Sequence, residues 1–157
     1  MLPLSLASMS DFRRTFYQWA FPVADPVNLN EERRQQTLAI KCAGRLLPLL
    51  PKVLSRKTAL TPQQETDYLL TLLLALRMGA LYEQLDHVAD RIVAILPQLP
   101  ASRHKTHLMT HLYIACDHTD LLSEALAAVS SWPSETLSDE DRYICQCLQE
   151  ELETAIA

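Results

Sequence analysis

Three histidines with helical spacing are the residues best placed to do chemistry in this chain. His104, His107 and His111 fall within an arc of about 60° if they lie on a helix, because each residue turns the helix by about 100°. His107 and His111 are four residues apart, a spacing that lets two imidazoles reach one metal ion. One hypothesis is therefore a metal-binding protein, or a metal-dependent enzyme or sensor, that uses this histidine cluster.

The histidine stripe also has a simpler interpretation. About 10 Å of helix rise separates His104 from His111, so one ion cannot easily bind all three rings. No glutamate follows His107 in the HExxH pattern, so the general base of a zinc hydrolase is missing from its place. We therefore expect a half-exposed polar border of an amphipathic helix, with no catalytic residue, no bound metal and no cofactor. An acid-sensitive surface is a third interpretation, because unperturbed imidazoles bind protons at about pH 6.5.

Other signals for catalysis are weaker. The two glycines of the chain are too few for a P-loop or a glycine-rich dinucleotide motif, and no GxSxG is present. Cys145 and Cys147 are two residues apart, so on a helix they point to different sides and make a poor shared metal site. These observations favour a protein that is not an enzyme.

Composition predicts a single all-helical domain over residues 1–157. The chain is 48% hydrophobic and 21% charged, with two glycines and few β-branched residues. Its formal net charge of −5 argues against duplex nucleic acid as a partner. Four cysteines without a disulfide pattern favour a reducing, cytoplasmic location, and the apolar run at residues 69–81 is too short to span a membrane. A start at Met9 would make the preceding residues, within 1–9, a disordered extension.

Apolar spacing, capping residues and prolines predict about seven helices and no strand. Thr61 and Gln64 form a capping-box pattern, and Ser138 with Asp141 approximates another. The helix that begins at Pro62 is apolar on nearly every side, so we expect it at the centre of the bundle or in a subunit interface. The expected helices cover residues 10–20, 30–47, 62–78, 81–96, 102–116, 120–132 and 139–156, with a short helix at 53–56 between prolines.

A weak self-similarity at a spacing of 36 residues links successive parts of the chain. Such a period predicts a stack of helical hairpins. The residues that return are apolar, small or proline: Leu72, Leu76, Gly79, Leu85, Ala89, Val93 and Pro97 recur as Leu108, Leu112, Ala115, Leu121, Ala125, Val129 and Pro133.

Because of these recurring positions, residues 30–156 resemble the tetratricopeptide-like class of helical repeats. The small residues Ala43, Gly79 and Ala115 and the prolines after two hairpins are similar to that class, whereas the tryptophan and tyrosine positions of its first helix are not filled. The resemblance implies an architecture only. A plain up-down helical bundle, which also produces near-repeats, is the alternative.

The leading functional hypothesis is a non-enzymatic interaction module that binds a peptide or helix of a partner protein. The predicted binding surface lies on the first helices of the hairpins and comprises Arg77, His104, His107, His111 and Tyr113. A homodimer is a further hypothesis, with residues 69–81 or the aromatic helix 10–20 in its interface. We expect no nucleic acid and no membrane among the partners.

Overall fold

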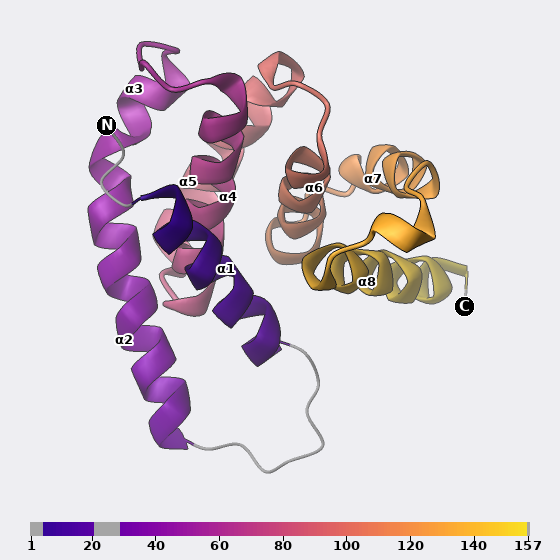
Figure 1. The fold of residues 1–157 in the computed structure, drawn as a ribbon, viewed down its shortest axis with the longest axis horizontal. Helices are drawn as coiled ribbons and strands as arrows, with labels where there is room; N and C mark the ends of the chain where they lie inside the picture. Colours follow the sequence, from indigo (N-terminus) through magenta and orange to yellow (C-terminus); the bar gives the residue numbers. More distant parts are fainter. Residues whose placement is uncertain (1–4, 21–28, 157) are drawn as a thin grey trace.

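The protein is described here from a computed structural model that covers residues 5–20 and 29–156 (Figure 1). These residues form α-helices and short 3₁₀ turns, and no strand occurs among them. The predicted all-α class is therefore confirmed. The α-helices are α1 (Leu6–Ala20), α2 (Leu29–Leu46), α3 (Leu50–Leu54), α4 (Pro62–Met78), α5 (Tyr82–Ile95), α6 (Arg103–Cys116), α7 (Leu121–Ser130) and α8 (Asp139–Ile156). The 3₁₀ turns are Leu47–Leu49, Leu96–Gln98 and Ser134–Thr136.

Helix α4 lies at the centre of the molecule, as its apolar circumference predicts. It packs against α1, α2, α5 and α6. The predicted capping box starts it: Gln64 N–H donates to Thr61 Oγ1 at 3.2 Å, and Thr61 N–H donates to Gln64 Oε1 at 2.9 Å. Tyr68 is fully buried and donates its hydroxyl to the carbonyl of Leu46, which joins α4 to the end of α2.

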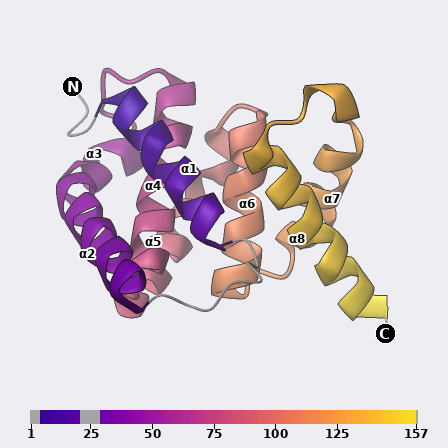
Figure 2. The same ribbon diagram turned by 60° about the horizontal axis from the view of Figure 1, so that its bottom comes forward.

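Helix α6 connects α4 to the C-terminal part of the chain. It packs on α4 and α5, and also on α7 and α8 (Figure 2). The hairpin α4–α5 therefore adjoins the hairpin α6–α7, an arrangement that both a repeat stack and a plain bundle allow. The tetratricopeptide-like resemblance stays a prediction.

The N-terminal helix begins earlier than predicted. Ser5 Oγ accepts a hydrogen bond from Ser8 N–H at 3.0 Å, so Ser5 takes the capping role expected of Ser10. Met9 is fully buried inside α1, so residues 6–9 are not the expected disordered extension. Residues 1–4 and the prolines of the following connection lie outside the described residues. Helix α1 packs on α4 and α8 of its own chain.

Helix α3 begins three residues earlier than the prolines around it predict. The expected short helix at 53–56 instead starts at Leu50, because Pro51 occupies its first turn, where a missing N–H costs no intrahelical hydrogen bond.

Within the described ranges, no helix is long and apolar enough to cross a membrane.

Candidate functional site

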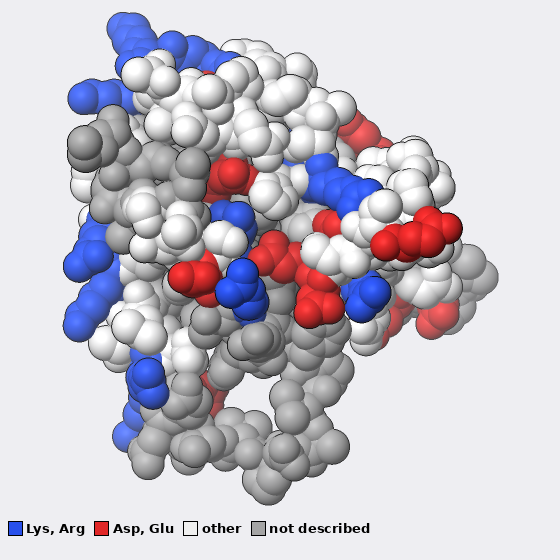
Figure 3. All heavy atoms as spheres, viewed as in Figure 1, with Lys and Arg blue, Asp and Glu red and all other residues white. Residues whose placement is uncertain are grey.

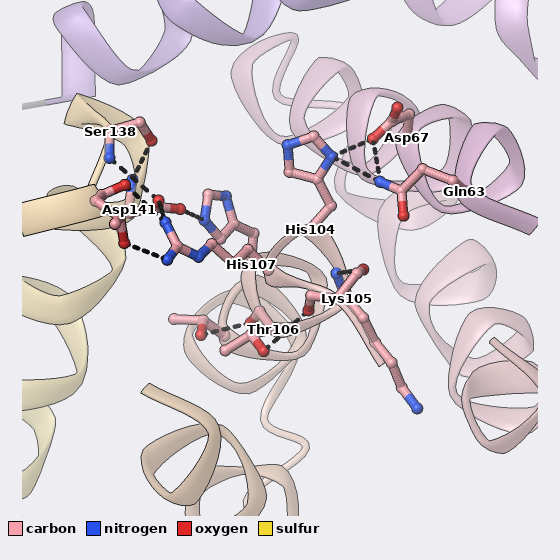
Figure 4. A network of polar contacts seen from close by, with 12 residues as sticks. Gln63, Asp67, His104, Lys105, Thr106, His107, Ser138 and Asp141 are labelled. Carbon is pink, nitrogen blue, oxygen red and sulfur yellow. Dashed lines mark hydrogen bonds and ion pairs between the residues drawn. The ribbon is translucent and has the colours of Figure 1, made fainter. Parts of the chain in front are cut away.

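The histidine stripe of α6 is largely buried, which differs from the expected half-exposed border. His107 is 1% exposed and His111 is 0% exposed, whereas the side chain of His104 remains partly accessible. His104 and His107 point to different neighbours, Asp67 and Asp141 (Figure 4). His111 contacts a third neighbour, Arg77. Helices α1, α4 and α8 cover the stripe and supply these neighbours.

His107 belongs to a buried polar clamp between α6 and α8. Its Nε2 lies 2.8 Å from Asp141 Oδ1, and Arg103 NH1 donates to Asp141 Oδ2 at 2.9 Å. Asp141, the third residue of α8, completes the predicted capping box: its N–H donates to Ser138 Oγ, and Ser138 N–H donates back to its carboxylate, both at 3.1 Å. The same carboxylate therefore starts α8 and fastens it to α6.

Arg103 extends the clamp to the turn before α8. Its guanidinium donates to the Thr136 carbonyl at 2.8 Å and to Thr136 Oγ1 at 2.6 Å. The guanidinium carbon also lies 5.3 Å from the centre of the Trp132 ring, within cation–π range. Four chain segments thus converge on one ion pair.

Burial determines the protonation of this clamp. Desolvation lowers the pKa of His107, although its hydrogen bond to Asp141 opposes that effect. Burial alone would raise the pKa of Asp141, but hydrogen bonds from His107, Ser138 N–H and Arg103 together hold it well below its usual range. We infer a neutral His107 that donates Nε2–H to an ionised Asp141 at neutral pH.

His111 occupies a second buried contact, between α4, α1 and α8. Arg77 NH1 lies 3.1 Å from His111 Nδ1, and the guanidinium carbon of Arg77 lies 5.7 Å from the centre of the Phe16 ring. The His111 ring meets Phe16 edge-on at 5.9 Å and stacks on Tyr143 at 6.3 Å. Complete burial, and then the nearby Arg77 cation, lower the pKa of His111 well below its usual value, so its Nδ1 accepts from Arg77.

The two remaining residues of the predicted surface make separate ion-pair or hydrogen-bond contacts. His104 Nδ1 contacts the carboxylate of Asp67 on α4, and Gln63 Nε2 lies 3.3 Å from the same nitrogen. The Tyr113 hydroxyl donates to Glu151 Oε2 on α8 at 3.2 Å. Each contact joins α6 to a neighbouring helix, so the stripe as a whole acts in packing.

The arrangement is unsuited to a metal ion. His107 faces a carboxylate that already accepts from Arg103, and His111 faces a guanidinium that repels a cation. Among the residues that the structure describes, no group of three or more histidines, cysteines or acids could hold a metal. The structure thus offers the metal hypothesis no site in the part of the chain that it covers.

Several surface hollows border these helices, among them one of about 420 Å³ that Arg103 and Trp132 line. Arg77 lines a hollow of about 470 Å³ together with Tyr82 and Tyr143, whereas His107, His111 and Tyr113 do not reach it. The expected groove around Arg77 therefore contains only part of the predicted residue set, and its use in binding stays a prediction. A second groove, of about 350 Å³, lies between α1 and α2 and was not predicted. Lys41 and Arg45 line its α2 side, but nothing in the sequence of α2 indicates that α1 forms the other side.

The fold and the buried polar contacts define an all-helical bundle whose α6 histidines hold helices together. No protein-family model matches the chain, and no curated protein matches it in sequence. One solved structure is similar: a transcription anti-terminator antagonist, UpxZ, from Bacteroides uniformis. The TM-score is 0.63 at 22% sequence identity, over 96% of this chain and 94% of that chain. The two proteins therefore share a fold along nearly their whole lengths.

Proposed function

We propose that this chain is a non-enzymatic interaction module that binds a transcription anti-termination factor and blocks its action. The observation that carries the proposal is the shared fold with an anti-terminator antagonist over 96% of the chain. The likeness extends over nearly the whole of both chains, so it supports the proposal through the complete fold rather than through one shared segment.

The use of the polar residues supports a binding role. The histidines, Arg103 and Asp141, which are the residues most suited to chemistry, are engaged in contacts between helices. Large apolar side chains instead lie exposed on α2 and at the start of α5: Leu38 is 45%, Ile40 44% and Tyr82 63% exposed. These exposed apolar side chains are available for contact with another protein.

A transcription read-through assay tests this function. Purified RNA polymerase transcribes a template with a terminator, and an anti-termination factor from the same organism raises read-through. Adding this chain in molar excess is expected to return read-through to the level without the factor, and the two proteins are expected to co-elute in gel filtration. Unchanged read-through together with separate elution would refute the proposal. The same chain denatured by heat is the control for non-specific effects.

A further inference from the structure

The cations of this chain are concentrated on one segment. Residues 33–64 contain seven of the 14 Lys and Arg residues and no Asp or Glu, whereas all 19 acidic residues lie elsewhere. The segment forms most of α2, all of α3 and the start of α4. Lys and Arg predominate along the edge of the molecule that carries α2 and α3 (Figure 3). A protein with a formal net charge of −5 thus presents one basic face.

A groove of about 350 Å³ runs between this basic face and α1. Phe12 and Cys42 contribute apolar surface to it, and Leu38, 45% exposed, stands on the α2 side. Lys41 and Arg45 also line the α2 side, and neither forms an ion pair with a residue that the structure describes. Asp11 lines the opposite, α1 side and pairs with Arg14 at 3.3 Å. Apolar surface and two cations that have no ion-pair partner among the described residues therefore occur in the same groove.

The spacing of these side chains matches one helical stripe. Leu38, Lys41 and Arg45 are three and four residues apart on α2, so they project side by side along the groove. Along α2 the backbone advances by about 1.5 Å per residue. A second helix packed against α2 advances by the same amount, so its side chains can follow this stripe. A second helix with apolar residues on one face and carboxylates beside them would meet apolar groups and cations in register.

We propose that the α1–α2 groove binds an amphipathic helix of a partner protein, with the acidic flank of that helix facing Lys41 and Arg45. The proposal rests on the proposed function in that it names the kind of segment through which the partner is recognised. Charge complementarity selects an acidic helix, and Leu38 and Phe12 supply the apolar contact that holds it.

Nucleic acid would also be attracted to a basic face, but it fits this groove less well. Exposed Leu38 and Ile40 lie among the cations, and neither can neutralise a phosphate. The 19 acidic residues elsewhere in the chain would repel a polyanion that extended beyond the groove. Of these, Asp11 lines the groove and pairs with Arg14, and a short acidic helix on the α2 side is short enough to avoid the acidic residues outside the groove.

The probe is a fluorescein-labelled synthetic helix of about 16 residues, long enough to span the exposed stripe of α2. It carries leucines three and four positions apart on one face and glutamates beside them. A second peptide has lysine in place of each glutamate, and a third probe is a single-stranded RNA of similar length. Fluorescence anisotropy measures each dissociation constant at low and at physiological salt.

The acidic peptide is expected to bind at least about tenfold more tightly than the lysine peptide and to weaken with salt, as charge pairing requires. Lys41→Glu with Arg45→Glu is expected to weaken it about tenfold, because two favourable pairs become unfavourable. The matched control, Lys52→Glu with Lys57→Glu, changes the net charge equally on the same basic segment outside the groove and is expected to leave binding within about twofold. All four positions are exposed, so circular dichroism should report the same fold in both variants.

Several results would overturn the proposal. The first two are equal dissociation constants for the acidic and lysine peptides and no detectable binding of the acidic peptide. The third is a control variant that weakens binding of the acidic peptide as much as the Lys41 and Arg45 variant does. The fourth is RNA that binds more tightly than the acidic peptide and depends equally on Lys41 and Arg45. Light scattering that shows a dimer dissociated by the Lys41 and Arg45 substitutions would assign the groove to a second copy instead.

The read-through assay separates this proposal from the function on which it rests. If the Lys41 and Arg45 variant loses the peptide but still antagonises the anti-termination factor, the groove is not the recognition site, and the proposed function stands. If the wild-type chain binds the peptide as expected but does not antagonise, the groove stands and the proposed function fails.

Discussion

The two buried histidines of α6 should make the stability of the protein depend on pH. Burial lowers the pKa of both His107 and His111, with the Arg77 cation adding to the effect at His111. In the unfolded chain each imidazole titrates at about pH 6.5. Below that pH the unfolded state binds protons that the folded state does not, so stability falls as the pH is lowered.

The magnitude follows from this linkage. Between pH 7.5 and 5.5, each histidine that stays neutral in the folded state lowers the free energy of unfolding by about 1.4 kcal/mol. Both together lower it by at most about 3 kcal/mol, and by less if the hydrogen bond to Asp141 lets His107 take up a proton. Such a loss is a large fraction of the stability of a typical domain.

Urea denaturation followed by circular dichroism at a series of pH values measures the effect. The wild-type protein should lose stability steadily between pH 7 and 5.5. His111→Gln should show a shallower dependence, although it is less stable at every pH, whereas His87→Gln, at an exposed position, should keep the wild-type slope. A stability that is flat or rises towards acid, or the wild-type slope in His111→Gln, would refute the assignment of neutral buried imidazoles.

Further substitutions test the packing. Asp141→Ala should destabilise the protein by about 2–3 kcal/mol in urea denaturation, because buried donors lose their acceptor, whereas Asp139→Ala, 94% exposed at the same helix start, should cost less than about 1 kcal/mol. Gly44→Ala should stabilise α2 by about 0.5–1 kcal/mol, because the added Cβ would meet nothing within 4 Å. Gly79→Ala should destabilise the protein by about 1 kcal/mol, because the added Cβ would lie 3.0 Å from a backbone oxygen. A loss of stability in Gly44→Ala, or a gain in Gly79→Ala, would contradict this reading. Burial raises the pKa of Cys42 to about 11, so alkylation at neutral pH should be about a hundredfold slower in the folded than in the unfolded protein by mass spectrometry; equal rates would exclude a buried thiol.

Helix positions were predictable because local signals define them. The predicted bounds of α4 and α8 agree with the structure, since a capping pattern starts each of them, and α6 was placed correctly by Ser102. The start of α1 was missed because two serines, Ser5 and Ser10, are both suitable caps, and burial of Met9 between them decides in favour of Ser5.

The candidate site was predictable only in part. Helical spacing placed His104, His107 and His111 on one stripe, which is correct. Their burial depends on Arg77, Asp141 and other residues more than 30 positions away, and no local pattern announces those contacts. The α1–α2 groove was missed for the same reason, because helix spacing within α2 says nothing about the helix beside it.

The dual contact of Asp141 locks the register of the last helix. The carboxylate completes the N-terminal cap of α8 and receives His107 and Arg103 from α6. If α8 slid by one residue, its side chains would rotate by about 100° and advance by about 1.5 Å, which would remove Asp141 from both roles at once. The same carboxylate therefore both caps this helix and holds it against α6. Length changes in the preceding turn are tolerable only where they leave Ser138 and Asp141 three residues apart.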